Sequence, residues 1–218
     1  MRLIGLFKKL IGRANHINAI ADRVSKADIP DGYAGGSLAN DNILIVSNAS
    51  LSDQVVETVF EREKVDYVIL STDKKLDAYD INNASSNLVG PFSHIINVIY
   101  DSEQIALINR EGLYNDKDAS YLLYQWHQQE VDYLVNLNQY ASICTIFISE
   151  DTTDSLVKKK NAEMLIKGIA EVLSNHGIIC NGIIANNSHN LIELLESSVF
   201  LSSRYGQIMT GEVLNFIS

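Results

Sequence analysis

The sequence predicts a doubly wound α/β fold with a mainly parallel sheet, and three observations support this prediction. Apolar side chains recur at three- and four-residue intervals from Ala162 to Leu173, which is the period of an amphipathic helix. Gly177 follows, and only a residue without a Cβ turns cheaply out of a helix through the left-handed region. Residues 178–184 are then almost continuously apolar, as expected of a parallel strand that is covered on both faces.

The same alternation of strand and helix begins near the start of this region. Residues 42–46 (NILIV) and 66–70 (DYVIL) are predicted strands, and residues 51–63 form the helix between them. Only a short stretch separates this unit from the next apolar run, 94–99. We therefore expect residues 78–81 to form a remnant strand and at least one covering helix to be missing.

The carboxyl-terminal half supplies the remaining elements. A long helix is predicted over residues 118–140 and a buried strand over 142–149. A further helix, LIELLESSVFLSS, follows the helix–turn–strand unit. On the long helix, one tryptophan and three tyrosines are expected to form packing or subunit contacts, because aromatic side chains carry large burial energies in both settings: Tyr121, Tyr124, Trp126 and Tyr133.

The pattern A-E-x-L-x-x-H-G-I-x-x-N-x-I, which begins at Ala170, is similar to the late helix and strand of short-chain dehydrogenases/reductases. Thr210 begins the segment TGEVL, which looks like the stretch leading into the family's last strand. The resemblance runs from Asn42 to the end of the chain. It implies a trimmed, Rossmann-like form of the family's fold over residues 42–218.

The resemblance also implies a glycine-rich loop, T-G-x-x-x-G-x-G, after the first strand, where the backbone approaches the pyrophosphate of NAD(P). Residues 47–54 read SNASLSDQ instead, without any of the three glycines. Side chains crowd the approach, and Asp53 adds a negative charge at the start of the helix. No cofactor is therefore expected. Ser47, Asn48 and Ser50 are vestigial cofactor-binding positions, and Ser50, Ser52 and Asp53 are expected to cap the helix.

Two other candidates for a cofactor site have simpler interpretations. Asp73, just after the second strand, could hold a ribose hydroxyl and is retained as a vestigial position. A solvated loop acid beside Lys74 and Lys75 is the simpler interpretation. Gly32, Gly35 and Gly36 precede the first strand, whereas a phosphate-binding loop must follow a strand, so a hinge is expected there.

For the active centre, the resemblance implies a Tyr four residues before a Lys at the start of the central helix. The Tyr donates a proton, and the Lys depresses its pKa. Counting back from the A-E-x-L motif places Lys159 at the Lys position and Ser155 at the Tyr position, so the phenol is missing. Lys158, Lys159 and Lys160 are then expected to form a solvated run, in which Lys159→Ala would be nearly neutral. Ser149 matches the family's catalytic serine. Ser149, Ser155 and Lys159 are thus vestigial, and no catalytic residue is expected.

Two more positions depart from the family. Residues 97–100 (NVIY) replace the N-N-A-G turn that borders the nicotinamide, so a bulky residue stands in place of its glycine. Only four residues separate Asn186 from Leu191, where the family places a helical lid over the substrate. Without a lid the site cannot exclude water from a hydride transfer.

Composition excludes several classes of protein. At 218 residues and 46% hydrophobic content, the chain is expected to form one domain with an appendage. The net charge is −10, and residues 1–26 contribute +5 to it (six Lys/Arg against one Asp). The rest of the chain therefore carries −15, which disfavours binding of nucleic acid. Cys144 and Cys180 lie in predicted strands and are read as free core thiols of a cytoplasmic protein. The five histidines show no ligand spacing, so no metal site is expected.

Residues 1–26 are predicted to form an amphipathic helix, and residues 27–41 a linker. The helix carries a stripe of apolar residues at alternating four- and three-residue steps: Leu3, Phe7, Leu10, Ala14, Ile17, Ala21 and Val24. This pattern is typical of a helix that docks on a partner or on a membrane interface, here an acidic membrane surface. Packing on its own domain is the equal alternative. The initial apolar run is too short for a secretory signal.

These observations favour a catalytically inactive protein of this fold that acts by association, as a homo-oligomer or with an active relative. The alternative is an NAD(P)-dependent oxidoreductase with an atypical loop, in which Lys159 or Ser149 donates the proton. A third hypothesis, which can coexist with the first, is a membrane-peripheral adaptor held by residues 1–26.

Overall fold

The computed structural model describes residues 38, 41–72, 74–86, 88–101, 119–137, 141–203, 206 and 209–216. The chain divides into two units, Met1–Gly35 and Gly36–Ser218. The predicted amino-terminal helix and nearly all of the predicted linker lie outside the described residues. In the described part of the chain, no helix is long and apolar enough to cross a membrane.

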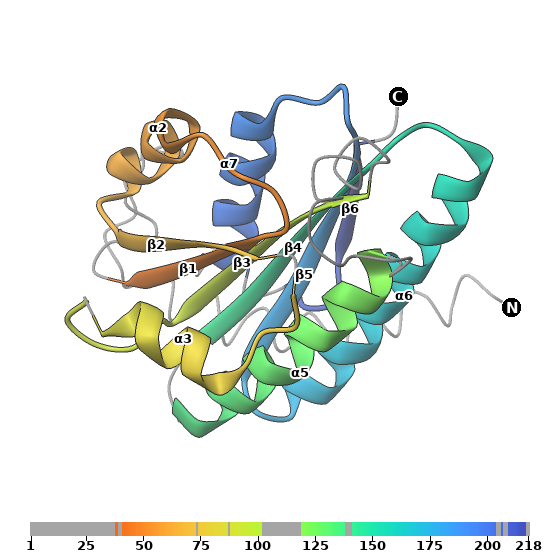
Figure 1. The fold of residues 1–218 in the computed structure, drawn as a ribbon. Helices are drawn as coiled ribbons and strands as arrows, with labels where there is room; N and C mark the ends of the chain where they lie inside the picture. The colour runs from red at the N-terminus through yellow and green to blue at the C-terminus, as the bar shows by residue number, and fades with distance from the viewer. Residues whose placement is uncertain are drawn as a thin grey trace, which may run out of the picture. The chain divides into compact units, whose positions relative to one another are not determined.

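The second unit is built on a six-stranded, parallel sheet with the strand order β2-β1-β3-β4-β5-β6 (Figure 1). Its strands are β1 (Asn42–Ser47), β2 (Asp66–Ser71), β3 (His94–Asp101), β4 (Ala141–Ser149), β5 (Ile178–Asn186) and β6 (Val213–Phe216). The chain moves outward from β1 to β2 and then crosses back to β3. The winding direction therefore reverses between β1 and β3, as in doubly wound folds, which confirms the predicted fold class.

Helices cover both faces of the sheet (Figure 1). On one face lie α2 (Asp53–Glu63) and α7 (Leu191–Ser202); on the other lie α3 (Ala78–Ser85), α5 (Ala119–Leu137) and α6 (Thr153–Ser174). The apolar residues of the strands divide between two cores, one under each layer. Both cysteines are free and buried, as predicted. Cys144 lies in the core under α2 and α7, and Cys180 in the core under α5 and α6.

The predicted remnant strand at residues 78–81 is wrong. These residues begin helix α3, which starts with a capping box: Asp77 accepts from the backbone N–H of Asp80, and the Asp80 carboxylate accepts from the N–H of Asp77. Leu76 and Ile81 are buried and tie the helix to the core. A single helix thus connects β2 to β3, and β2 is left at the edge of the sheet.

The long helix and its neighbour follow the prediction closely. α5 covers Ala119–Leu137, within the predicted 118–140. Trp126 is fully buried and donates its indole N–H to the Lys74 carbonyl at 2.8 Å, which confirms the packing interpretation for this residue. Gly177 has a φ of +70°, the left-handed conformation expected where the chain leaves α6.

Candidate functional site at the carboxyl edge of the sheet

The carboxyl ends of β1 and β3 form the switch point where doubly wound folds bind their ligands. Here the side chain of Asn48 spans this gap. Its Nδ2 donates to the Tyr100 carbonyl at 2.9 Å, and its Oδ1 accepts from the Tyr100 N–H at 2.8 Å. The Asn48 N–H also donates to the Val98 carbonyl at 3.4 Å. The amide therefore continues the ladder of hydrogen bonds between the two strands, at the place where a doubly wound fold receives its ligand.

The loop before α2 is held by local contacts. Ser47, the last residue of β1, is buried, and its hydroxyl accepts from the Ala49 N–H at 3.2 Å. Ser52 occupies the N-cap position of α2, but its side chain makes no capping hydrogen bond, so the predicted hydroxyl cap is wrong. Asp53 supplies the negative charge of the first turn, and Ser50 is exposed. Asp73 lies outside the described residues.

The ends of β3 and β4 meet in a small polar cluster. The Ser149 hydroxyl donates to Asp101 Oδ2 at 3.1 Å, and Lys158 Nζ lies 3.0 Å from Asp101 Oδ1. Ser149 is buried, and the Asp101 side chain is largely so. The structure therefore brings Ser149 and one lysine of the run to a single carboxylate.

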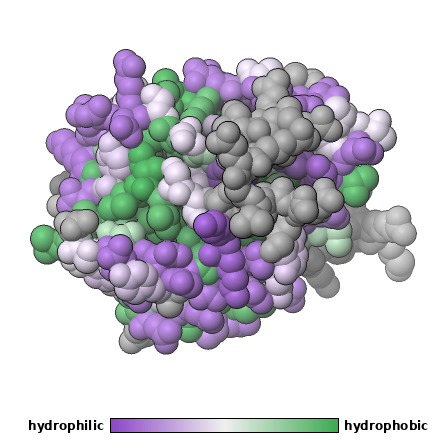
Figure 2. All heavy atoms as spheres, in the orientation of Figure 1, coloured by the Kyte–Doolittle hydropathy of each residue, from purple (hydrophilic) through white to green (hydrophobic). Residues whose placement is uncertain are grey.

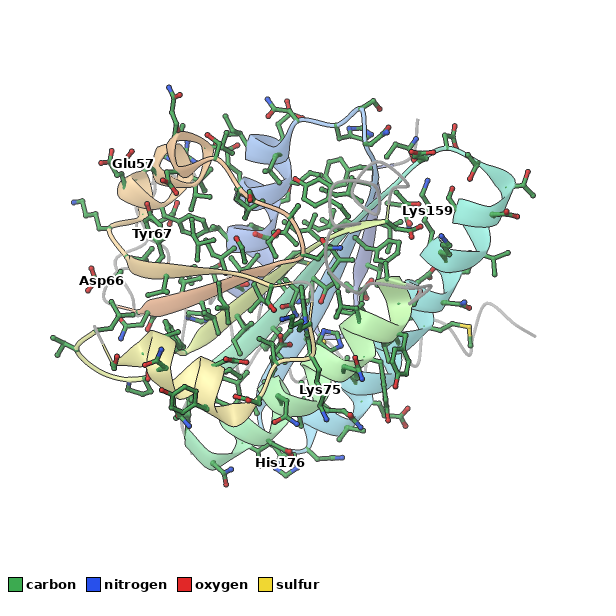
Figure 3. The ribbon with its side chains drawn as sticks, in the orientation of Figure 1. Glu57, Asp66, Tyr67, Lys75, Lys159 and His176 are labelled. Atoms are coloured by element: carbon green, nitrogen blue, oxygen red, sulfur yellow. The ribbon has the colours of Figure 1, made fainter. Side chains whose placement is uncertain are left out.

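Lys159 does not belong to a solvated run, and that expectation is wrong for this residue. It is 4% exposed, and its Nζ donates to Asn186 Oδ1 at 2.6 Å, from α6 to the end of β5 (Figure 3). Lys160 does fit the expectation, because it is exposed and pairs with Glu163. Lys159 lies three residues before Ala162, on the buried stripe of α6, and this spacing was the signal that could have placed it inside.

Ser155, at the position of the missing phenol, has a structural role. Its N–H donates to Thr152 Oγ1 at 3.2 Å, and its Oγ accepts from the Thr152 N–H at 3.0 Å, which is a capping box at the start of α6. The hydroxyl also donates to the carbonyls of Glu150 and Thr152. Its hydrogen-bonding capacity is thus used by the helix end.

The connection between β5 and α7 is as short as the sequence indicates. Asn187–Asn190 alone connect β5 to α7, and the turn is held by hydrogen bonds from the Asn187 N–H to the Ser149 carbonyl and from the His189 N–H to the Asn186 carbonyl, both at 3.1 Å. Residues 97–100 are also part of a longer strand than predicted, because β3 continues in register with β4 as far as Asp101.

One polar cluster was missed by sequence reasoning. Under α5, Glu130 Oε2 accepts from Asn97 Nδ2 at 2.9 Å, and His127 Nε2 lies 3.0 Å from Thr145 Oγ1 and 3.9 Å from Glu130 Oε2. All four residues are fully buried. Burial raises the pKa of Glu130 to about 8, although the hydrogen bond from Asn97 opposes this, and burial lowers the pKa of His127 to about 3. Burial therefore favours the neutral form of both side chains.

No protein-family model matches this sequence, and no curated protein matches it either. Solved structures do. A short-chain dehydrogenase from Mycobacterium smegmatis is 16% identical with a TM-score of 0.52, over 88% of this chain and 98% of that one. A double mutant of a short-chain dehydrogenase/reductase from Serratia marcescens is 14% identical with a TM-score of 0.56, over 83% and 97%. An NADH-dependent reductase complexed with NAD is 12% identical with a TM-score of 0.57, over 83% and 96%. At these identities the likeness establishes the fold.

The chain thus has the fold of short-chain dehydrogenases, and an asparagine side chain joins the carboxyl ends of β1 and β3. Among the described residues, no group of three or more His, Cys, Asp or Glu is arranged to hold a metal ion.

Proposed function

We propose that this chain is a catalytically inactive protein of short-chain-dehydrogenase fold that works by association with other polypeptide chains. The observation that carries the proposal is the bridge from Asn48 to Tyr100. A dinucleotide in the usual pose needs close approach of the backbone at the ends of β1 and β3, and the asparagine side chain occupies this place with two hydrogen bonds. Opening the crevice would break both.

Three further observations support the loss of hydride transfer. The position one turn before Lys159 holds Ser155, which caps the helix, so the phenol of the family is missing there. The short Asn187–Asn190 turn leaves no room for a helical lid between β5 and α7, where the family places one to exclude water. Asp53 places its carboxylate at the start of α2, where a helix would otherwise attract phosphate.

The test is a titration of the full chain with NADH and with NADPH, followed by calorimetry and by thermal shift. A ligand at about 100 times its Kd adds roughly 2.7 kcal/mol of stability, so micromolar binding cannot escape detection. We expect neither heat of binding nor a shift in melting temperature up to about 1 mM nucleotide. This concentration is about a hundred times a Kd of about 10 µM. Saturable binding of either nucleotide would overturn the inactive assignment.

One observation favours the second candidate, an NAD(P)-dependent oxidoreductase. Lys159, Ser149 and Asp101 all lie at the carboxyl edge of the sheet, and all three are wholly or largely buried. Buried ionisable groups at such an edge are common in active sites. If nucleotide binds, this candidate further requires that Lys159→Met abolish turnover while Lys160→Met, an exposed neighbour, retains it.

For the association, we propose a second copy of this chain on the face formed by α5 and α6. A hollow of about 380 Å³ lies between the two helices, lined in part by Tyr124, Val131, Ile169 and Val172. Tyr124 and Val172 are about half exposed. Among the described residues, the lining of this hollow is nearly uncharged, with Asp132 as its one carboxylate. An acidic chain can therefore meet its own copy there with little repulsion.

Gly168 supports this choice of surface. It lies in the middle of α6, and a Cβ built on it would meet nothing within 4 Å in the described part of the chain. A glycine inside a helix costs about 0.5–1 kcal/mol relative to alanine. Because no contact among the described residues requires it, the glycine suits a surface that another backbone approaches closely.

Light scattering across a range of concentrations tests the association. The wild-type chain should gain mass with concentration, and Gly168→Glu should prevent this by placing a charge in the contact. Asn82→Glu, which adds the same charge to an exposed position on α3, is the matched control. A wild-type chain that stays monomeric, or a control that behaves like Gly168→Glu, would contradict a dimer through α5 and α6.

A further inference from the structure

The strand β2 forms an exposed, apolar edge of the sheet. Among the described residues it pairs only with β1, in regular register along all six of its residues. Its residues Tyr67–Leu70 are only half-buried, whereas every residue of β1 is buried. Figure 2 shows hydrophobic residues gathered over β2, between α2 and α3. The single-helix connection between β2 and β3 leaves these side chains at the surface.

This edge lacks the features that usually protect a sheet from pairing with another chain. Natural edges are blunted by proline, by lysine, by a bulge or by shortness. The strand β2 reads DYVILS, with no proline or lysine, and its pairing to β1 shows no bulge. The opposite edge, β6, is only four residues long and has an exposed asparagine, Asn215. Of the two edges, β2 is thus the one suited to accept another strand.

The backbone geometry of β2 shows which groups are available. Thr72 donates its N–H to the Ser47 carbonyl at 2.8 Å, so it faces β1. Because backbone groups alternate in direction along a strand, Tyr67, Ile69 and Ser71 turn their N–H and C=O groups toward the open edge. A strand added beside β2 would meet these three residues.

The side chains of β2 divide between the two faces. Tyr67 and Ile69 pack toward the α2 layer, and Val68 and Leu70 pack toward the α3 and α5 layer. An added strand would therefore lay alternate side chains against these two environments. On the α3 side, Val68 and Leu70 are aliphatic, and Asp66 at the start of the strand is the only acid of β2 on that side.

On the α2 side, the edge is acidic. Asp53, Glu57 and Glu61 recur every fourth residue and so form one stripe along α2. Burial and then the charges of Glu57, Asp53 and Glu61 raise the pKa of Tyr67, so the negative charge of this stripe acts on the tyrosine.

Two of the acidic residues near β2 lie toward its amino end. Figure 3 shows Glu57, Tyr67 and Asp66 near its amino end, with Lys75 far along toward its carboxyl end. Lys64 lies at the amino end too, where the carboxylates outnumber it. The side of an added strand that faces α2 would thus meet an excess of negative charge.

We propose that the edge of β2 binds an extended segment of another protein as a seventh strand, with Lys or Arg on its α2 side and aliphatic residues on its α3 side. Backbone pairing would supply the affinity and the alternating side chains the specificity. A second copy of this chain fits less well, because two chains of net charge −10 would bring their acidic stripes together. This surface is separate from the α5 and α6 face and does not depend on it.

Two fluorescent octapeptides test the proposal on the full chain: blocked (Val-Lys)₄ and blocked (Val-Glu)₄, followed by anisotropy at low salt. The lysine peptide should bind, and the glutamate peptide should bind at least about tenfold more weakly. Replacing Glu57 and Glu61 together by lysine should reverse this order. If the lysine peptide fails to bind at about 1 mM, or if the reversal of charge leaves the order unchanged, the proposal is wrong.

The backbone contribution has its own test. Ile69→Pro removes an N–H that faces the open edge and spares those that face β1, so it should abolish peptide binding. Ile69→Val, which keeps the N–H, should preserve binding. Should Ile69→Pro misfold, hydrogen exchange on the wild-type chain decides instead: the peptide must protect the amides of Tyr67, Ile69 and Ser71. Binding without this protection would overturn the proposal. So would a wild-type dimer that Ile69→Pro dissociates, because the occupant would then be a second copy.

Discussion

The Nζ of Lys159 lies 2.6 Å from Oδ1 of Asn186, which ties the first turns of α6 to the end of β5. Both residues are buried. A hydrogen bond from a charged donor in such a place contributes about 1.5–3 kcal/mol, and removal of one partner leaves the other unsatisfied.

Lys159→Met should therefore lower the free energy of unfolding by about 1–3 kcal/mol, because the methionine fills the space of the lysine stem but leaves Asn186 Oδ1 without its donor. This replaces the expectation of a nearly neutral Lys159→Ala, which assumed an exposed side chain. Urea unfolding monitored by circular dichroism measures the change. Lys160→Met is the matched control and should stay within about 0.5 kcal/mol. Equal effects of the two substitutions would show that the buried hydrogen bond does not stabilise the fold.

The buried pair under α5 predicts a pH profile of stability. The pKa of Glu130 is about 8 in the folded chain against 4.5 unfolded, and that of His127 is about 3 against 6.5. Between pH 4.5 and 6.5 the pair binds one proton in either state, so its contribution is constant. Above pH 6.5 the folded pair holds one proton more than the unfolded pair, and stability falls until about pH 8. Below pH 4.5 the unfolded pair holds one more, and stability falls again toward pH 3.

The alkaline loss should amount to about 2 kcal/mol between pH 6.5 and 8, at about 1.4 kcal/mol per pH unit. Glu130→Gln keeps the shape of the side chain and cannot lose a proton, so this loss should vanish in the variant. The measurement is urea unfolding at half-unit intervals of pH. A variant that still loses the same stability between pH 6.5 and 8 would assign the alkaline arm to another group.

Close packing of α6 on β5 predicts a steric effect at Gly182. A Cβ at this position would lie 2.5 Å from Ile166 Cδ1 and 3.4 Å from the Thr145 carbonyl oxygen. Gly182→Ala should thus cost about 1–3 kcal/mol of stability, the usual range for overpacking. Ile166→Val removes the nearest atom, so the double variant should recover part of the loss. Simple additivity of the two substitutions would show that the clash is relieved elsewhere.

The predicted amino-terminal helix can be tested by removal. Burial of an apolar side chain contributes roughly 1.5–3 kcal/mol. We therefore expect another surface to cover the stripe formed by Leu3, Phe7, Leu10, Ile17 and Val24. We predict that a chain starting at Ala27 loses mass by light scattering or loses binding to anionic liposomes. If truncation changes neither and only lowers the melting temperature, the helix is an intramolecular strap.

The order of strands and helices could be predicted because it depends on local patterns. The spacing from Ala162 to Leu173 reflects the burial of one helix face. The glycine at 177 reflects the left-handed conformation that ends this helix. The prediction of a strand at residues 78–81 failed because the capping carboxylates of Asp77 and Asp80 were a stronger signal than the few apolar residues there.

The site was harder to predict because it depends on contacts between distant residues. Asn48 and Tyr100 are 52 positions apart, and nothing in either local sequence shows that their backbone and side chain meet. Lys159 was misplaced for another reason. A charged residue in a run of three lysines looks solvated, and only its place on the apolar stripe shows that it is buried.

The two buried cysteines can report which helical layer separates from the sheet first. Cys144 and Cys180 lie on opposite faces of the sheet, and burial raises the pKa of both thiols well above their usual range. Neither can react until its own layer lifts, because the thiolate is the reactive form. Timed alkylation followed by peptide mass measurement would therefore time the departure of α2 and α7 at one thiol and of α5 and α6 at the other. Unequal rates would reveal two cooperative units where a melting curve shows only one transition.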